Sequence, residues 1–197
     1  MSEPIRELGP RQALHERVSA AIVDAAARVL AEHGEQASMS DVAAAAGVAR
    51  ATVYRYFPRR DALLARVGEI AVADAGGRLA ASRISEVAPD DGVARAVRAL
   101  TDVGDAFIVL ARERLQPDRR QFETEVAGPL RELFERGQAS GAFRKDISTS
   151  WLVETLIGLI VSVLGARPKL GREDTVAAIT QLFLDGARAA REPDGRR

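Results

Sequence analysis

Apolar residues recur along the chain at intervals of three and four positions, and they do not alternate with polar residues over any useful length. The first such stripe contains Val18, Ile22, Ala25, Val29 and Leu30. This spacing places the apolar side chains on one face of a helix that packs against a core. Because the same periodicity recurs in later segments, the sequence predicts an all-α fold.

Two short helices are predicted directly after this stripe. Ser38 can cap the first, because Asp41 follows three residues later and the pair can satisfy otherwise unpaired backbone amides. Gly47 can adopt a positive φ angle and so permits a sharp turn. Pro58 disfavours helical geometry at the residue before it and closes the second helix. Two short helices joined by a glycine turn are typical of a helix-turn-helix motif, here residues 38–57.

Helices are also predicted over most of the remaining chain. A helix that begins near Asp61 meets Gly76 and Gly77, and each glycine costs about 1 kcal/mol relative to alanine inside a helix. We therefore expect a kink or break at these two residues. Residues 121–138 are expected to form either a pair of helices or one helix kinked around Gly128-Pro129. Further helices are expected over residues 90–114, 148–165 and 172–190.

Composition narrows the class of protein. Of the 197 residues, 47% are hydrophobic, which permits a real core, and cysteine is absent, which excludes disulfides and thiolate chemistry. The first residues lack the apolar run of a secretory signal. The longest apolar run, residues 151–166, is interrupted by Glu154 and is shorter than the roughly 20 residues that span a bilayer. We expect a cytoplasmic protein that does not enter a membrane.

The formal net charge is zero, so the position of the charges matters more than their sum. Residues 48–66 contain a single acid, Asp61, against five arginines. No other stretch of the chain has so large an excess of one charge. The five are Arg50, Arg55, Arg59, Arg60 and Arg66.

The predicted helix over residues 49–57 has two different sides. Val53 lies on the inner side, with Ala49 and Phe57 beside it. The outer side carries small, hydroxylated, aromatic and cationic residues: Ala51, Thr52, Tyr54 and Arg55. The major groove of DNA accepts this mixture, because phosphates line its walls and base edges form its floor. The alternative is that the tyrosines are half-buried rings and the arginines are simply solvated.

The run SMSDVAAAAGVARATVYRYFPRRDALL resembles the DNA-binding domain of the TetR family of bacterial transcriptional repressors. It combines the hydroxyl-capped helix, the Gly47-Val48 turn, a Thr-x-Tyr in the recognition helix, and an aromatic residue followed by a basic pair. The segment LRELFERGQASGAFRKD is similar to one common in the second domain of that family. The resemblance implies that the following residues contact DNA: Ser38, Met39, Ser40, Arg50, Ala51, Thr52, Tyr54, Arg55, Tyr56 and Arg60.

The resemblance implies an all-α protein with an N-terminal three-helix helix-turn-helix DNA-binding domain. A C-terminal helical domain would bind a ligand and dimerise. The expected boundaries are a flexible N-terminal arm over residues 1–14, a DNA-binding domain over 15–66, an effector-binding and dimerisation domain over 67–190, and a loose tail over 191–197.

The helix expected over residues 148–165 is apolar on nearly every side. Such a helix must be covered on every side, and a second subunit can supply part of the cover. In TetR-like proteins the last two long helices form a four-helix bundle with those of a partner, whereas a helix buried wholly within its own chain is the alternative. The expected interface residues are Trp151, Leu152, Leu156, Leu159, Ile160, Val163, Ile179, Leu182 and Phe183.

The resemblance also implies an effector pocket among the helices between Asp90 and Phe143. The identity of the effector is unknown, and no ligand-binding residue is assigned. The aromatic residues Phe107, Phe122, Phe134 and Trp151 are candidates to line the pocket, although core packing is the alternative role for each. The Gly76-Gly77 pair is a candidate hinge for the effector response.

Together these features predict a homodimeric repressor that binds an inverted-repeat operator in double-stranded DNA and is released by a small-molecule effector. Neither histidine lies in a metal-ligand spacing, and we find neither a phosphate-binding glycine loop nor a nucleophile motif. We therefore expect no enzyme activity, no cofactor and no metal. A helical adaptor that binds another protein is the main alternative, and a helical enzyme is the more remote one.

Overall fold

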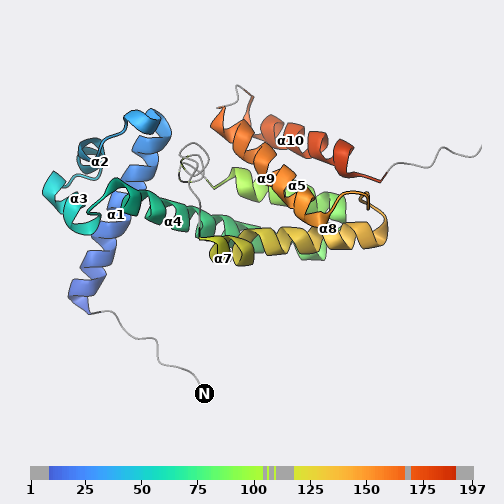
Figure 1. Ribbon diagram of the computed structural model, residues 1–197, viewed down its shortest axis with the longest axis horizontal. Helices are drawn as coiled ribbons and strands as arrows, with labels where there is room; N and C mark the ends of the chain where they lie inside the picture. Colours follow the sequence, from blue (N-terminus) through green and yellow to red (C-terminus); the bar gives the residue numbers. More distant parts are fainter. Residues whose placement is uncertain (1–8, 104–105, 107–108, 110–117, 167–169, 190–197) are drawn as a thin grey trace, which may run out of the picture. The chain divides into compact units, whose positions relative to one another are not determined.

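The computed structural model describes residues 9–103, 106, 109, 118–166 and 170–189. All regular secondary structure in these residues is helical, apart from an isolated antiparallel bridge between Phe143 and Arg188, and the predicted all-α fold is confirmed (Figure 1). The chain divides into two compact units between Val67 and Gly68. The predicted tail and the first eight residues of the predicted arm lie outside the described residues.

The first unit is a small helical domain in which α1 packs against α2 and α2 packs against α3. Its core contains the fully buried side chains of Ile22 on α1, Val42 on α2 and Val53 on α3. The helices are α1 (Pro10–His33), α2 (Met39–Ala45), α3 (Arg50–Tyr56) and the first turns of α4 (Arg60–Ala81).

The first helix is longer than predicted. It begins at Pro10, so residues 10–14, which were expected to belong to a flexible arm, are helical. They are not part of the apolar stripe that starts at Val18, because this end of α1 is largely exposed. The apolar stripe therefore predicted the part of α1 that packs against the core, but it did not predict where the helix begins.

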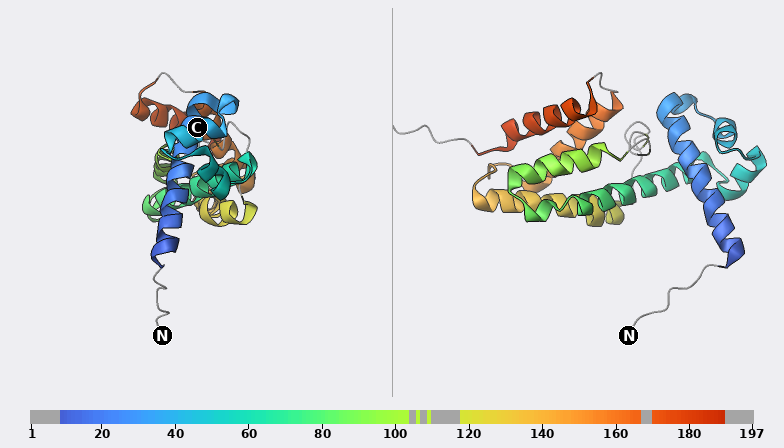
Figure 2. Two further views of the ribbon diagram at one scale, coloured as in Figure 1. Left: turned by 90° about the vertical axis from the view of Figure 1, so that its left-hand side faces the viewer. Right: turned by 180° about the vertical axis from the view of Figure 1, so that it is seen from behind.

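The second unit is built around α5, which packs against α8, α9 and α10, as Figure 2 shows from behind. Its core includes Leu100 on α5, Leu133 and Phe134 on α8, and Leu156 on α9, all nearly or fully buried. Besides the rest of α4, its elements are the 3-10 turn η2 (Ile84–Glu86), α5 (Pro89–Thr101), α7 (Arg119–Phe122), the π-helical turn η3 (Glu123–Ala127), α8 (Gly128–Ser140), α9 (Thr149–Gly165) and α10 (Arg172–Ala187).

A kink or break was predicted at Gly76-Gly77, and the break is wrong, because α4 continues through both residues to Ala81. Gly76 is a close-approach position. A Cβ atom there would lie 2.7 Å from the Cβ of Glu125, closer than two such atoms can pack. Gly76 therefore lets η3 approach the backbone of α4, whereas a Cβ on Gly77 would meet nothing within 4 Å.

The helix predicted over residues 90–114 ends at Thr101 instead. The hydroxyl of Thr101 donates a hydrogen bond to the carbonyl of Arg98 at 3.0 Å, and Asp102 caps the helix. A side chain that bonds to the preceding turn competes with helix propagation, and hydrophobic periodicity does not reveal this competition. Most of the remaining predicted helix lies outside the described residues.

The irregularity predicted around Gly128-Pro129 takes the form of a π-helical turn. The N–H of Gly128 donates to the carbonyl of Glu123, five residues earlier. Pro129 has no N–H to donate and its ring collides with a normal helical carbonyl four residues earlier. The wider π-helical turn accommodates the proline between α7 and α8, and Pro129 then occupies the first turn of α8.

Candidate DNA-binding surface

The helix-turn-helix begins at a complete capping box. The hydroxyl oxygen of Ser38 accepts a hydrogen bond from the N–H of Asp41 at 3.2 Å, and the Asp41 carboxylate accepts from the Ser38 backbone N–H at 2.8 Å. The Ser38 hydroxyl donates to the same carboxylate at 2.7 Å, and this bond holds the pKa of Asp41 below its ordinary value. The predicted cap of α2 is therefore confirmed, and it fixes where that helix starts.

The turn between α2 and α3 depends on Gly47. Its φ angle is +66°, a left-handed conformation that costs other residues about 1 kcal/mol or more. The N–H of Val48 then donates to the carbonyl of Ala43 at 3.0 Å, which closes the end of α2. Two residues later α3 begins at Arg50, so this single turn sets the direction of the recognition helix.

The two sides of α3 differ as the sequence predicts, except that Ala49, which was expected on the inner side, is exposed. Val53 is fully buried and Phe57, just after the helix, is nearly so. Arg50, Ala51, Tyr54 and Arg55 are exposed. Small, aromatic and cationic side chains therefore lie together on the free side of a helix whose other side is held by the core.

Each arginine on this face lies over a tyrosine ring. The Cζ atom of Arg50 lies 5.3 Å from the ring centroid of Tyr54, and Arg50 Nη2 donates to the Tyr54 hydroxyl at 3.3 Å. The Cζ atom of Arg55 lies 5.5 Å from the ring of Tyr56. These cation–π contacts limit the freedom of the guanidinium groups while leaving them accessible. The arrangement suits an extended anion such as a phosphate backbone.

The other predicted contact residues divide into three groups. Ser38 and Ser40 are exposed, and Thr52, Tyr56 and Arg60 are half-buried. Met39 needs a correction, because its side chain is buried among the core residues of the first unit. Met39 is the first residue of α2 and points inward, whereas its two serine neighbours point outward. The motif match assigned DNA contact to all three residues because it does not distinguish buried from exposed positions.

Sequence reasoning missed one residue at this surface. His15 on α1 stacks on Tyr56, with ring centroids 4.4 Å apart and an angle of 27° between the ring planes. The two residues are far apart in the sequence and neither belongs to an apolar stripe. Only the packing of α1 beside the end of α3 reveals the pair.

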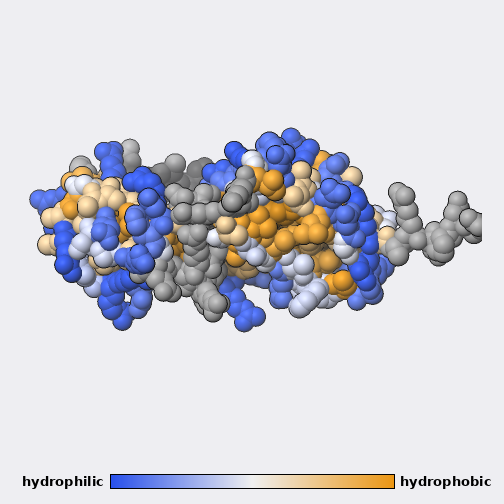
Figure 3. Space-filling model, turned by 90° about the horizontal axis from the view of Figure 1, so that it is seen from above, coloured by the Kyte–Doolittle hydropathy of each residue, from blue (hydrophilic) through white to orange (hydrophobic). Residues whose placement is uncertain are grey.

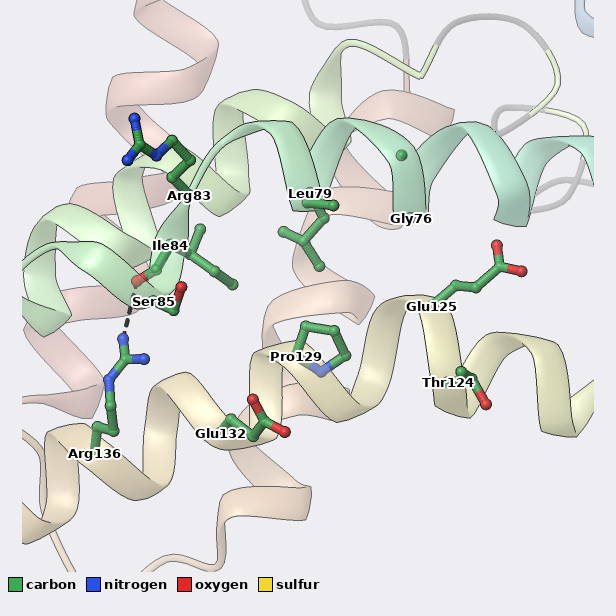
Figure 4. A pocket seen from close by; sticks show the side chains of 12 residues that line it. Gly76, Leu79, Arg83, Ile84, Ser85, Thr124, Glu125, Pro129, Glu132 and Arg136 are labelled. Carbon is green, nitrogen blue, oxygen red and sulfur yellow. Dashed lines mark hydrogen bonds between the residues drawn. The ribbon is translucent and has the colours of Figure 1, made fainter. Parts of the chain in front are cut away.

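The second unit contains a groove of about 450 Å³ between α4 and the η3–α8 segment (Figure 4). Leu79, Ile84 and Pro129 supply apolar surface, and Glu125 and Glu132 supply carboxylates. Arg136 also lines the groove, and its Nη2 donates to the carbonyl of Ile84 at 2.9 Å. A groove of this size and mixed chemistry can hold a small organic molecule.

Of the aromatic residues predicted to line a pocket, the three that the structure describes do not line this groove. Phe134 is a fully buried core residue, Phe122 packs against the core, and Trp151 is exposed. Phe107 lies outside the described residues. Core packing, the alternative role, holds for Phe134 and Phe122, and the groove is lined mainly by smaller and charged side chains.

The outer face of α9 and α10 is an exposed apolar surface (Figure 3). Trp151 and Leu182 are 61% and 65% exposed. Together with Leu159 and Gly186 they border a groove of about 290 Å³. We call this region the α9–α10 surface. Large apolar side chains exposed side by side are typical of a surface that contacts another protein.

The predicted interface set is corrected in part. Leu159 and Val163 are half-buried, and Trp151 and Leu182 are exposed. The others are buried within their own chain, where they pack into the core of the second unit: Leu152, Leu156, Ile160, Ile179 and Phe183. The alternative of an intramolecular core thus holds for the inner side of α9, because that side packs against α5 and α8.

Among the residues that the structure describes, no helix combines the length and the apolar character needed to cross a membrane. The same residues contain no group of three or more histidine, aspartate or glutamate side chains that could hold a metal ion.

Comparison with known proteins places the helix-turn-helix in a family. Residues 22–67 match the model of the bacterial regulatory proteins of the tetR family. The chain is 52% identical over 64 residues to the transcriptional repressor LfrR of Mycolicibacterium smegmatis, a match that covers 32% of this chain and 31% of that repressor. It is 25% identical over 160 residues to the transcriptional regulator NfxB of Pseudomonas aeruginosa, covering 77% of this chain and 85% of NfxB.

The likeness extends to the whole fold. The crystal structure of the TetR-like regulator LfrR from Mycobacterium smegmatis in complex with proflavine has a TM-score of 0.73 and 26% identity, and the match covers 88% of this chain and 97% of LfrR. These relatives are transcriptional regulators and not enzymes, in agreement with the sequence prediction. The chain is therefore similar to the TetR family of bacterial regulatory proteins in the sequence of its helix-turn-helix domain and in its overall fold.

Proposed function

We propose that the protein is a homodimeric transcriptional repressor that binds an inverted-repeat operator through α3. The observation that carries this proposal is the outer face of the recognition helix. Arg50 and Arg55 lie exposed over tyrosine rings, on a helix placed by the Gly47 turn and backed by buried Val53. Phosphates along the walls of the major groove and base edges on its floor would meet cationic and phenolic groups here.

Dimerisation follows from the size of this surface. One helix-turn-helix contacts too little DNA for tight binding, whereas two related by a two-fold axis read half-sites one helical turn, about 34 Å, or a multiple of it apart. The α9–α10 surface can join the two subunits, because it exposes Trp151 and Leu182. The operator of such a dimer is an inverted repeat.

The effector would bind in the second unit. LfrR, whose fold is similar, was solved with proflavine, so a related chain holds a small organic molecule. In this protein the groove between α4 and α8 is the candidate place, because it offers apolar surface beside Glu125 and Glu132. Release from DNA requires that the effector bind the DNA-free conformation more tightly than the DNA-bound one.

Selection of DNA from a random pool by the purified protein tests the proposal. We expect enrichment of one inverted repeat, bound by a dimer, with an affinity that falls steeply as salt rises because counterions are released from phosphates. Binding to an isolated half-site should be much weaker. A protein that enriches no sequence, or whose capture of DNA does not respond to salt, would instead favour the protein-binding adaptor.

A further inference from the structure

The stack between His15 and Tyr56 joins two elements of the first unit. His15 lies on α1 and is exposed, and Tyr56 is the last residue of α3 and half-buried. Their ring centroids are 4.4 Å apart with planes 27° from parallel. The same tyrosine ring carries the guanidinium of Arg55, whose Cζ atom is 5.5 Å from its centroid. One ring therefore contacts both α1 and the exposed cation of the recognition helix.

The end of α3 needs such a contact. The helix has seven residues, and isolated helices shorter than about 12 residues are marginal in water. Val53 and Phe57 hold its inner side in the core, and the Phe57 N–H donates to the Val53 carbonyl at 2.8 Å. Those contacts do not fix the ring of Tyr56, which is only half-buried. Stacking on His15 of the 24-residue α1 supplies a second point of attachment.

We infer that His15 is a positioning residue for DNA binding: it holds the Tyr56 ring, and through that ring the Arg55 guanidinium, in the orientation that faces the duplex. This inference rests on the proposed function. His15 acts through Tyr56 and does not itself touch DNA. Any flat apolar ring of similar size at position 15 should therefore serve, since stacking depends on ring shape and not on the imidazole nitrogens.

The test compares the variants His15→Ala and His15→Phe in the full-length protein. The probe is the duplex that the wild-type protein enriches from a random-sequence pool. His15→Ala should weaken DNA binding by about threefold to tenfold for each recognition helix, because this factor corresponds to the free energy of one aromatic pair. His15→Phe should restore the wild-type affinity. Leu14→Ala, at the neighbouring exposed position on α1, is the matched control and should bind as the wild type does.

The same substitution in a protein that lacks Tyr56 distinguishes a positioning role of His15 from a general effect on folding. In a Tyr56→Leu protein, His15→Ala should cause no further loss of affinity, because the ring on which it acts is gone. Thermal unfolding of each variant, followed by circular dichroism, should show similar midpoints for His15→Ala and His15→Phe.

Four results would overturn the inference. Wild-type affinity in His15→Ala would show that the stack does not matter for binding. Equal losses in His15→Ala and His15→Phe, or an undiminished loss in the Tyr56→Leu background, would show that the imidazole contacts DNA itself. A wild-type protein that enriches no duplex would refute the proposed function, and this inference with it, before any variant is compared.

Discussion

The outer face of α3 and the α9–α10 surface are both exposed, yet they have opposite chemistry. On α3, Arg50 and Arg55 lie over tyrosine rings, so aromatic surface is covered by cations. On α9 and α10, Trp151 and Leu182 are exposed, and the groove between them is bordered mainly by apolar side chains. The first surface is suited to a polyanion and the second to another protein surface.

The difference shows how exposure should be interpreted. Exposed aromatic residues have no single meaning, since a tyrosine under an arginine and a tryptophan beside a leucine suit different partners. The identity of the neighbouring side chains decides which partner fits. Four experiments test the two surfaces and the core behind them, beginning with the largest expected effect.

Leu156→Ala should destabilise the second unit by about 2–5 kcal/mol, because it removes a fully buried side chain of α9 and leaves a cavity. Urea denaturation followed by circular dichroism measures the change. Leu182→Ala is the matched variant, since that leucine is exposed on the adjacent helix, and its effect on the stability of the monomer should be small. Equal losses from the two would mean that the division between the inner and outer sides is wrong.

The double variant Arg50→Glu with Arg55→Glu should weaken operator binding by at least about 100-fold, because each lost arginine contact costs roughly 1–3 kcal/mol and the new carboxylates repel phosphate. Electrophoretic mobility shift with the selected duplex measures the loss. Arg120→Glu reverses a charge that is exposed in the second unit and should leave binding nearly unchanged. If both proteins lost affinity alike, long-range charge and not contact at α3 would explain DNA binding.

The double variant Trp151→Asp with Leu182→Asp should convert the proposed dimer to monomers, raising its dissociation constant by about 30-fold or more, since exposed aromatic anchors at interfaces are worth about 2 kcal/mol. Sedimentation velocity over a concentration series measures it. Leu14→Asp places the same charge at an exposed leucine of the first unit and should leave the dimer intact. A dimer that survives the double substitution would place the subunit contact elsewhere.

Replacing each of the two adjacent glycines of α4 with alanine should change the stability of the protein in opposite directions. Gly77→Ala should stabilise the protein by up to about 1 kcal/mol, because its Cβ meets nothing and alanine favours the helix. Gly76→Ala should destabilise it, because its Cβ would lie 2.7 Å from that of Glu125. Chemical denaturation of both variants side by side measures the contrast, and a gain from Gly76→Ala would show that η3 can move away from α4 at little cost.

The first unit could be predicted from the sequence almost helix by helix. Its determinants are local: Ser38 caps a helix that begins one residue later, Gly47 supplies a left-handed turn, and Pro58 follows the end of α3. Such local signals for helix ends and turns can be recognised directly in the sequence. They did not reveal that Met39 points into the core, because a motif match treats neighbouring positions alike.

The second unit was harder to predict because its determinants are contacts between distant segments. The close approach of Glu125 to Gly76 joins η3 to α4, and the burial of Leu156 depends on α5 and α8. A helix that is apolar all round gives no indication of which side meets its own chain and which side a partner. The stack of His15 on Tyr56 went unnoticed for the same reason, although it lies in the first unit.

The π-helical turn η3 holds one residue more than an α-helical path from α7 to α8 would use. Removing one residue from it, together with Pro129→Ala, would leave the core-facing side chains of both helices in register. The same deletion inside α8 would rotate all later side chains of that helix by about 100°. Chain-length changes in this part of the protein can therefore be absorbed at η3, whereas within α8 they would turn Phe134 out of the core.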